Sequence, residues 1–139
     1  YEQRDTALMS AKPETTFTRS VNKHLPKEVY YMKNNNIYCA GVPDVWYSGP
    51  GGDLWVEYKF VVIPKRPDTV VKVELSELQK TWLRDRDAEG RDVGVIIGCA
   101  EGGVWFAGLS WDFEFTAEKF RTWVEDRKVL ASRIYSLIG

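Results

Sequence analysis

The sequence predicts one compact α/β domain, and three observations carry this prediction. Patterns typical of helices and strands alternate along all 139 residues, with no repeat, linker or low-complexity tract between them. A nearly continuous apolar run at 93–99 is typical of a strand that is buried on both faces. Glycine-rich turns at 49–53 and 102–103 each separate two apolar runs, as the turn of a β-hairpin does. We therefore expect residues 1–139 to form a single domain with a substantial apolar core.

The first half of the chain is predicted to hold one helix and three strands. The helix should begin near Pro13, with Ser10 as its N-cap and Glu14 as an acid in the first turn. Pro26 should end it, because proline cannot continue a helix. Alternating and β-branched runs then predict three strands, at 29–32, 42–48 and 54–63.

The second half is predicted to continue with a helix, two strands and a last helix. Ser76 followed by Gln79 matches a capping box, which predicts a helix that stops at Gly90. Thr116 offers the N-cap of the last helix. The expected ranges of the two strands and that helix are 93–99, 104–106 and 116–137. The predicted order is α-β-β-β-α-β-β-α.

Composition and charge limit which classes of function are expected. The formal net charge is −1, which does not suggest a protein that holds nucleic acid by basicity alone. No apolar run is long enough to cross a bilayer, and no signal-peptide core is evident, so we expect no membrane partner. The two cysteines show neither zinc-type spacing nor a CxxC motif, which indicates free thiols in a reducing cytoplasm.

Two acids and a lysine are the candidate chemical groups. Asp44 lies in the stretch 41–44 that opens one apolar run, inside the expected strand 42–48, and Glu57 and Lys59 lie on the next. Side chains alternate along a strand, so Glu57 and Lys59 should share a face, and a hairpin would place Asp44 opposite Glu57. Two carboxylates with an ammonium beside them suit a hard cation and phosphodiester hydrolysis. The alternatives are a solvated turn acid at Asp44, a simple Glu57–lysine ion pair, and a solvated lysine at Lys59.

The order of these motifs resembles that of the PD-(D/E)xK nuclease superfamily. The chain supplies an acid in the first helix, a Pro-Asp step, a Glu-x-Lys strand and a glutamine-bearing helix, here Glu14, Pro43-Asp44, Glu57-Tyr58-Lys59 and Leu75-Ser76-Glu77-Leu78-Gln79. It looks most like small phage-type and VRR-Nuc-like members, which are related to the Holliday-junction resolvases. The resemblance covers roughly residues 13–99.

The resemblance implies a restriction-endonuclease-like core, with a mixed central sheet flanked by helices, and an Mg2+- or Mn2+-dependent endonuclease that cleaves DNA, with RNA left open as a substrate. The implied metal ligands are Glu14, Asp44, Glu57 and the backbone carbonyl of Tyr58. Lys59 and Gln79 would join Asp44 and Glu57 in catalysis. Two alternatives stay open: Glu14 as an acid that only complements the helix dipole, and Gln79 as only the capping-box residue.

The resemblance also suggests binding partners, and two competing functions stay open. Lys65, Arg66 and Lys72 are the expected contacts to DNA phosphates, and a homodimer would fit a resolvase-like protein. A phage-encoded member would act in the cytoplasm of its host. Most tryptophans are expected in the core, whereas Tyr30, Tyr31 and Tyr47 are freer candidates for contact with nucleic acid. The rival functions are a catalytically silent nucleic-acid-binding or assembly module on the same fold, and an interaction protein with an aromatic surface.

Overall fold

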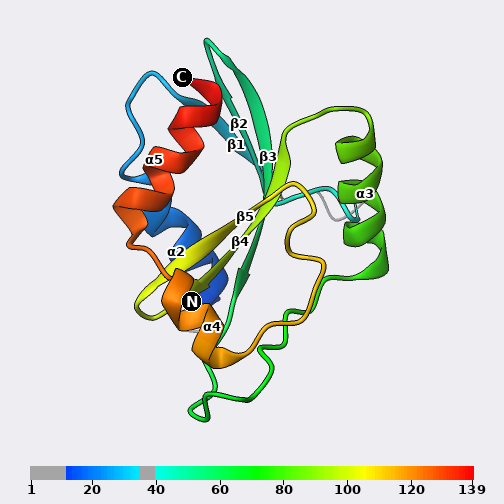
Figure 1. Cartoon of the computed structure of the whole chain (residues 1–139). Coiled ribbons are helices and arrows are strands. Elements are labelled where there is room, and N and C mark those ends of the chain that lie inside the picture. The colour runs from blue at the N-terminus through cyan, green and yellow to red at the C-terminus, as the bar shows by residue number, and fades with distance from the viewer. Residues whose placement is uncertain (1–11, 35–39) are drawn as a thin grey trace, which may run out of the picture.

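Five strands form one mixed sheet in the part of the chain that the computed structural model describes, residues 12–34 and 40–139 (Figure 1). The strands are β1 Tyr30–Lys33, β2 Val45–Gly49, β3 Gly52–Phe60, β4 Val93–Cys99 and β5 Gly102–Ala107. They lie in the sheet in their chain order. Only β3 and β4 run parallel, and the other neighbours are antiparallel. The parallel pair needs a crossover connection, which helix α3, Glu77–Ala88, supplies.

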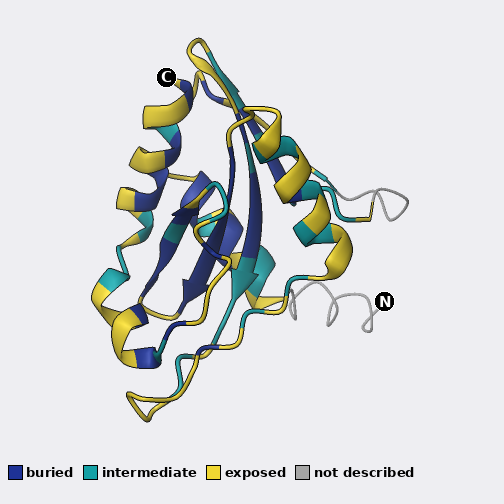
Figure 2. Ribbon diagram, turned by 45° about the vertical axis from the view of Figure 1, so that its right-hand side comes forward, coloured by how far each residue is buried: buried dark blue, intermediate teal, exposed yellow. Residues whose placement is uncertain are grey.

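Helices cover both faces of the sheet. α2, Pro13–Asn22, and α5, Arg127–Ile138, lie on one side, and α3 lies on the other (Figure 1). The short helix α4, Ala117–Trp123, contacts β5. Each side has its own apolar cluster, and the buried residues follow the strands and the inner faces of the helices (Figure 2). No helix within the described ranges is long and apolar enough to span a membrane.

Strand β3 contributes to both sides of the sheet. Leu54, Val56 and Tyr58 are fully buried in the cluster beneath α2 and α5. Because successive side chains alternate, Glu57 and Lys59 point to the opposite face, where α3 packs. The predicted arrangement, with Tyr58 on one face and the acid and lysine on the other, is confirmed.

The β2–β3 turn is glycine-rich because the end of α5 packs directly on it. The amide of Gly51 donates to the carbonyl of Ile138 at 2.8 Å. A Cβ atom at Gly49 would meet the Ile138 carbonyl oxygen, and one at Gly51 would meet the Gly139 carbonyl oxygen. The hairpin that positions the candidate site is therefore held by the C-terminal helix.

Several predicted boundaries differ from the structure. The N-cap of α2 is Lys12, which makes no side-chain cap hydrogen bond, and the predicted Ser10 cap lies outside the described residues. Helix α2 ends at Asn22, before Pro26, and β3 ends at Phe60 rather than at residue 63. Strand β2 begins at Val45 rather than at residue 42, which leaves Asp44 just before the paired strand.

The predicted last helix is interrupted and forms α4 and α5 instead. Between them, Glu125 exchanges two backbone hydrogen bonds with Gly103 of β5, at 2.8 and 2.9 Å. Val124 takes an extended conformation to reach this pairing, so the helix cannot continue. Asp126 then starts α5 by accepting a hydrogen bond from the amide of Val129 at 2.9 Å.

Candidate active site

The candidate site lies where β2 ends and β3 continues. The last β2–β3 pair is Val45 with Val56, and the same register places Asp44 opposite Glu57. Asp44 does not extend the ladder with its backbone. Its Oδ2 instead accepts the amide hydrogen of Tyr58 at 2.9 Å. The Asp44 carboxylate thus takes the place of the backbone acceptor that a further paired residue of β2 would supply. We call this place, where β2 stops pairing and β3 continues, the internal gap of the sheet.

The backbone of Tyr58 points into this gap. Trp55 donates its amide to Asp92, and Val61 donates to Gly98, so these odd-numbered residues of the β3 segment direct their backbone groups toward β4. Residues one step away in a strand direct theirs to the other side. The Tyr58 carbonyl therefore points to the same side as its amide, toward Asp44.

Glu57 is an almost fully buried acid, with 2% of its surface exposed. Its Oε2 accepts a hydrogen bond from Nε2 of Gln79 at 2.9 Å and lies 3.6 Å from Nζ of Lys59. Its Oε1 is buried without a donor among the described residues. Burial first, and then the negative charge of Asp44, raise the pKa of Glu57 to about 9, although Lys59 acts in the opposite direction. Without a cation, Glu57 is therefore neutral at pH 7.

Gln79 completes the capping box and also contacts the candidate site. The backbone amide of Gln79 donates to Oγ of Ser76 at 3.1 Å. Its side-chain Oε1 accepts from the backbone amide of Ser76 at 2.9 Å, which completes the predicted capping box. Its remaining polar atom, Nε2, is the donor to Glu57. The cap orients the side-chain amide so that its NH2 group meets the acid.

Glu14 approaches the site from the opposite layer, in the first turn of α2. It is half-buried, and it lines one hollow with Lys59 and Lys72 and another with Asp44 and Lys33. Burial, followed by the charge of Asp44, raises the pKa of Glu14, while Lys59 and Lys12 lower it. The helix dipole explains an acid at this position, and the effect of Asp44 on its pKa indicates proximity to the site as well.

The three acids interact electrostatically but do not form a ready-made ligand set. Within residues 12–34 and 40–139, no three His, Cys, Asp or Glu side chains are placed so that they could hold one metal ion together. Asp44 is turned to the amide of Tyr58, and Oε2 of Glu57 is turned to Gln79. Binding of one ion by all three acids would require at least Asp44 to turn away from the Tyr58 amide.

The predicted phosphate contacts are only partly near this site. Lys72 lines the hollow that Glu14 and Lys59 share. Lys65 and Arg66 are exposed in the loop that follows β3, and neither lines that hollow. Arg66 lies 3.9 Å from Asp68, with both side chains about four-fifths exposed, a pair that adds little stability.

Sequence reasoning missed three polar residues around the site. Lys33 and Asn34 line the hollow beside Asp44, and Glu74 lines the one beside Lys59. The amide of Asn34 donates to the Asp44 carbonyl at 2.7 Å. The pairing of Lys33 with Val45 brings the end of β1 next to Asp44, and no local sequence signal specifies that pairing.

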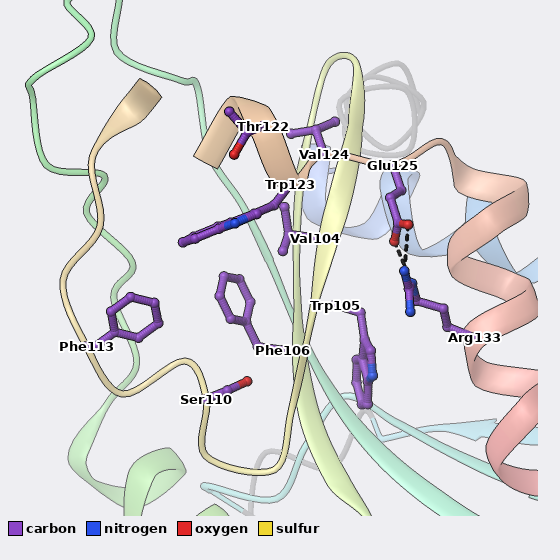
Figure 3. Close-up of a pocket in the computed structure, with 10 residues that line it drawn as sticks. All are labelled: Val104, Trp105, Phe106, Ser110, Phe113, Thr122, Trp123, Val124, Glu125 and Arg133. Carbon is purple, nitrogen blue, oxygen red and sulfur yellow. Dashed lines mark hydrogen bonds and ion pairs between the residues drawn. The ribbon is translucent and has the colours of Figure 1, made fainter. Parts of the chain in front are cut away.

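A separate hollow lies beside the edge strand β5. It is bordered by Phe106, Phe113 and Trp123, while the ion pair between Glu125 and Arg133 stands on the other side of the strand (Figure 3). None of the candidate site residues lines it. It is therefore distinct from the site at the β2–β3 gap.

No family model matches the sequence, and no curated protein matches it. Among solved structures, the chain is similar to Hjc, a Holliday junction resolvase from the archaeal hyperthermophile Archaeoglobus fulgidus. The TM-score is 0.54 at 12% sequence identity, and the alignment covers 89% of this chain and 99% of that one. The likeness confirms the predicted restriction-endonuclease-like fold, a mixed sheet flanked by helices.

Proposed function

We propose that this protein is a divalent-metal-dependent endonuclease that hydrolyses phosphodiester bonds in DNA. One observation carries the proposal: Glu57 is buried at an internal gap of the sheet, with Asp44 opposite it and Lys59 beside it. A fold shared with a protein described as a Holliday junction resolvase supports the same conclusion.

The residues of the gap fit a hard cation. Oε1 of Glu57 is buried without a donor in the described part of the chain, and an acid with a pKa near 9 costs stability when it ionises. A cation would relieve that cost. Carboxylate and carbonyl oxygens are the ligands that Mg2+ and Mn2+ prefer. Asp44 and Glu57 would hold the ion, with Glu14 and the Tyr58 carbonyl completing the set. When bound, the ion supplies a water of lowered pKa and offsets charge on the phosphate.

The chain's own residues position the reactants. Gln79 holds Oε2 of Glu57, which leaves Oε1 as the free ligand atom. Lys59 projects from the same face of β3, and its ammonium would orient the attacking water and stabilise the charge that develops on the phosphate. Lys72, at the rim of the hollow, would contact a neighbouring phosphate.

Lys65 and Arg66 would extend this contact along the DNA backbone without reading its sequence. A homodimer would place two such sites on one substrate, as symmetric assemblies allow. The net charge of −1 limits how much affinity phosphate contacts alone can supply.

Cleavage of a panel of labelled substrates tests the proposal. The purified protein, with Mg2+ or Mn2+, is incubated with linear, nicked, forked, four-way and single-stranded DNA, and with RNA. We expect cleavage of at least one DNA that EDTA stops. Glu57→Gln and Lys59→Ala should remove this activity, while Glu101→Gln, an exposed acid outside the site, should retain it.

Two results would contradict the proposal. One is full activity in Glu57→Gln with an unchanged requirement for metal. The other is tight DNA binding with no cleavage under any metal, which would favour the catalytically silent binding module.

A further inference from the structure

A row of aromatic side chains crosses the first three strands next to the candidate site. Tyr30 of β1, Trp46 of β2 and Trp55 of β3 have neighbouring ring centroids 5.8 and 6.2 Å apart. We call these three residues the aromatic row. Its inner end meets Trp82 of α3, at 5.3 Å from Trp55.

The aromatic row continues the face that carries the candidate chemistry. Trp55, Glu57 and Lys59 stand at alternate positions of β3 and therefore share one face of the sheet. A strand rises about 3.3 Å per residue, so Trp55 lies roughly 7 Å along β3 from Glu57. A nucleotide strand whose phosphate reaches Glu57 would therefore bring its adjoining bases to within about that distance of Trp55.

Core packing does not account for the row. Tyr30 is 59% exposed, and its neighbour Met32 is 47% exposed. Trp55 packs at the edge of the α3-side cluster, and Trp46 is outside both clusters of the described residues. Large aromatic side chains usually bury most of their surface, and a contiguous exposed apolar patch commonly marks a binding surface.

The half-buried indole of Trp46 is held in a fixed orientation. Its indole Nε1–H donates to Oδ2 of Asp53, across the β2–β3 hairpin, at 2.9 Å. This bond occupies the only polar atom of the indole and fixes the orientation of the ring. The ring can then offer its π face to a ligand with little loss of conformational entropy.

We propose that the aromatic row stacks unpaired bases of the DNA strand that enters the candidate site. This inference rests on the proposed nuclease function and names its substrate class: DNA with a single-stranded segment adjoining the cleaved bond. Base faces in a duplex are already stacked on one another, so only unpaired bases can meet the rings. Stacking on aromatic side chains contributes about 1–3 kcal/mol per base, and this supplies affinity that a chain of net charge −1 lacks from phosphate contacts.

Binding in EDTA tests the row separately from cleavage. The probe is a fluorescein-labelled oligothymidylate of about 15 nucleotides, compared by anisotropy with a blunt duplex of the same length. Trp46→Leu keeps apolar bulk but removes the ring, and Trp46→Phe restores a ring. We expect the Leu variant to bind the oligothymidylate about 5- to 150-fold more weakly, and the Phe variant to recover most of that loss.

Two further variants keep this test interpretable. Phe113→Leu removes an aromatic ring that is 54% exposed and lies outside the row, and it should bind like the wild type. Tyr30→Leu changes a side chain that is largely exposed, so it should fold even if a Trp46 variant does not, and it should also weaken binding. Equal affinity in Tyr30→Leu, Trp46→Leu and the wild type would overturn the proposal. So would a Trp46→Leu variant that loses self-association on a sizing column but keeps its affinity.

Cleavage by the wild-type protein supplies a test without mutation. With Mn2+, a substrate with an unpaired strand should be cut faster than a blunt duplex. Abasic positions within about three nucleotides of the cut, on one side, should slow cleavage, because they remove the bases that stack. Equal cleavage of both substrates with no abasic effect would overturn the inference and leave the nuclease function standing. Ring-dependent binding of oligothymidylate without any cleavage would instead overturn the nuclease function and leave the stacking of bases on the aromatic row standing.

Discussion

The two faces of β3 carry polar groups of opposite character. On the α2–α5 side, the hydroxyl of Tyr47 lies 2.6 Å from both the Tyr58 hydroxyl and Oδ1 of Asn22, all buried. On the α3 side, Glu57 is equally buried, yet Oε1 finds no donor in the described residues, and the acid has a pKa near 9. A buried carboxyl whose pKa is raised this far by burial, by the charge of Asp44 and by a hydrogen bond shared with Asp44 is typical of a functional site.

The difference separates stability from function within one strand. The tyrosine network uses neutral groups that satisfy one another, which stabilises the fold at any pH below tyrosine ionisation. The Glu57 side instead holds an ionisable group that costs stability when it is charged. Substitutions on the α2–α5 face should therefore change stability equally at all pH values, and those on the α3 face should change cleavage or the pH dependence of stability.

The largest effect should come from Lys59→Met, which keeps the aliphatic stem and removes the charge. Loss of a group that stabilises transition-state charge typically reduces kcat by about 100- to 1,000-fold. Stability at pH 7 should change little, because Glu57 is neutral there and the Lys59 ammonium, 3.6 Å away, has no charged Glu57 partner to lose, while Met keeps the buried stem. Single-turnover cleavage with Mn2+ measures the rate, and urea unfolding provides the control. A Lys59→Met variant with the wild-type rate would remove Lys59 from the chemistry.

The next effect is a pH dependence of stability in EDTA. The pKa of Glu57 is raised from 4.5 to about 9, so the folded state binds a proton more tightly than the unfolded state between these values. The resulting stability is complete below about pH 4.5 and is lost as pH rises toward 9. At about 1.4 kcal/mol per pKa unit, the loss at pH 7 is roughly 3 kcal/mol.

Glu57→Gln removes this titration without changing the shape of the side chain. We expect the variant to be more stable than the wild type at pH 8 and similar at pH 4.5, as measured by urea unfolding. A smaller slope should remain, because the pKa of Glu14 is also raised. Added Mg2+ or Mn2+ at pH 8 should stabilise the wild type and not the variant. Parallel stability curves for the two proteins would show that Glu57 is not the titrating group.

Much of the α3 side was predictable because its determinants are local or periodic. The period of two in β3 placed Glu57 and Lys59 together, and the hairpin register placed Asp44 opposite Glu57. The capping box fixed Gln79 within three residues of Ser76. The metal-ligand roles remain predictions, since they depend on how the carboxylates reorient.

The α2–α5 side was less predictable because its partners are distant in sequence. Tyr47 was expected to be free for nucleic acid, and this was wrong: it is fully buried, and its partner Asn22 lies 25 residues away. The division of the last helix has the same cause. Local propensity favours one helix, and the pairing of Glu125 with Gly103 across the sheet edge overrides it.

A smaller effect is expected from Tyr47→Phe, on the satisfied face. The change removes one hydroxyl and leaves Oδ1 of Asn22 and the Tyr58 hydroxyl without their partner. Such a loss typically costs about 1–3 kcal/mol. The cost should be the same at pH 5 and pH 8, and the cleavage rate should not change. A pH-dependent cost would show that the two faces are coupled through β3.

A small effect on stability should also come from Gln79→Glu, which separates the cap from the contact with Glu57. A glutamate at this position also completes a capping box, so the helix start should lose less than about 1 kcal/mol. The NH2 group that donates to Glu57 is lost, however, and a fourth carboxylate joins Glu14, Asp44 and Glu57 at the site. Cleavage should therefore fall while the fold persists, and more Mn2+ should be needed to balance the added charge. Gln79→Ala loses the cap as well and serves as the matched control. If the Glu and Ala variants lose equal stability and neither loses activity, Gln79 acts only as a cap, and the contact with Glu57 has no functional consequence.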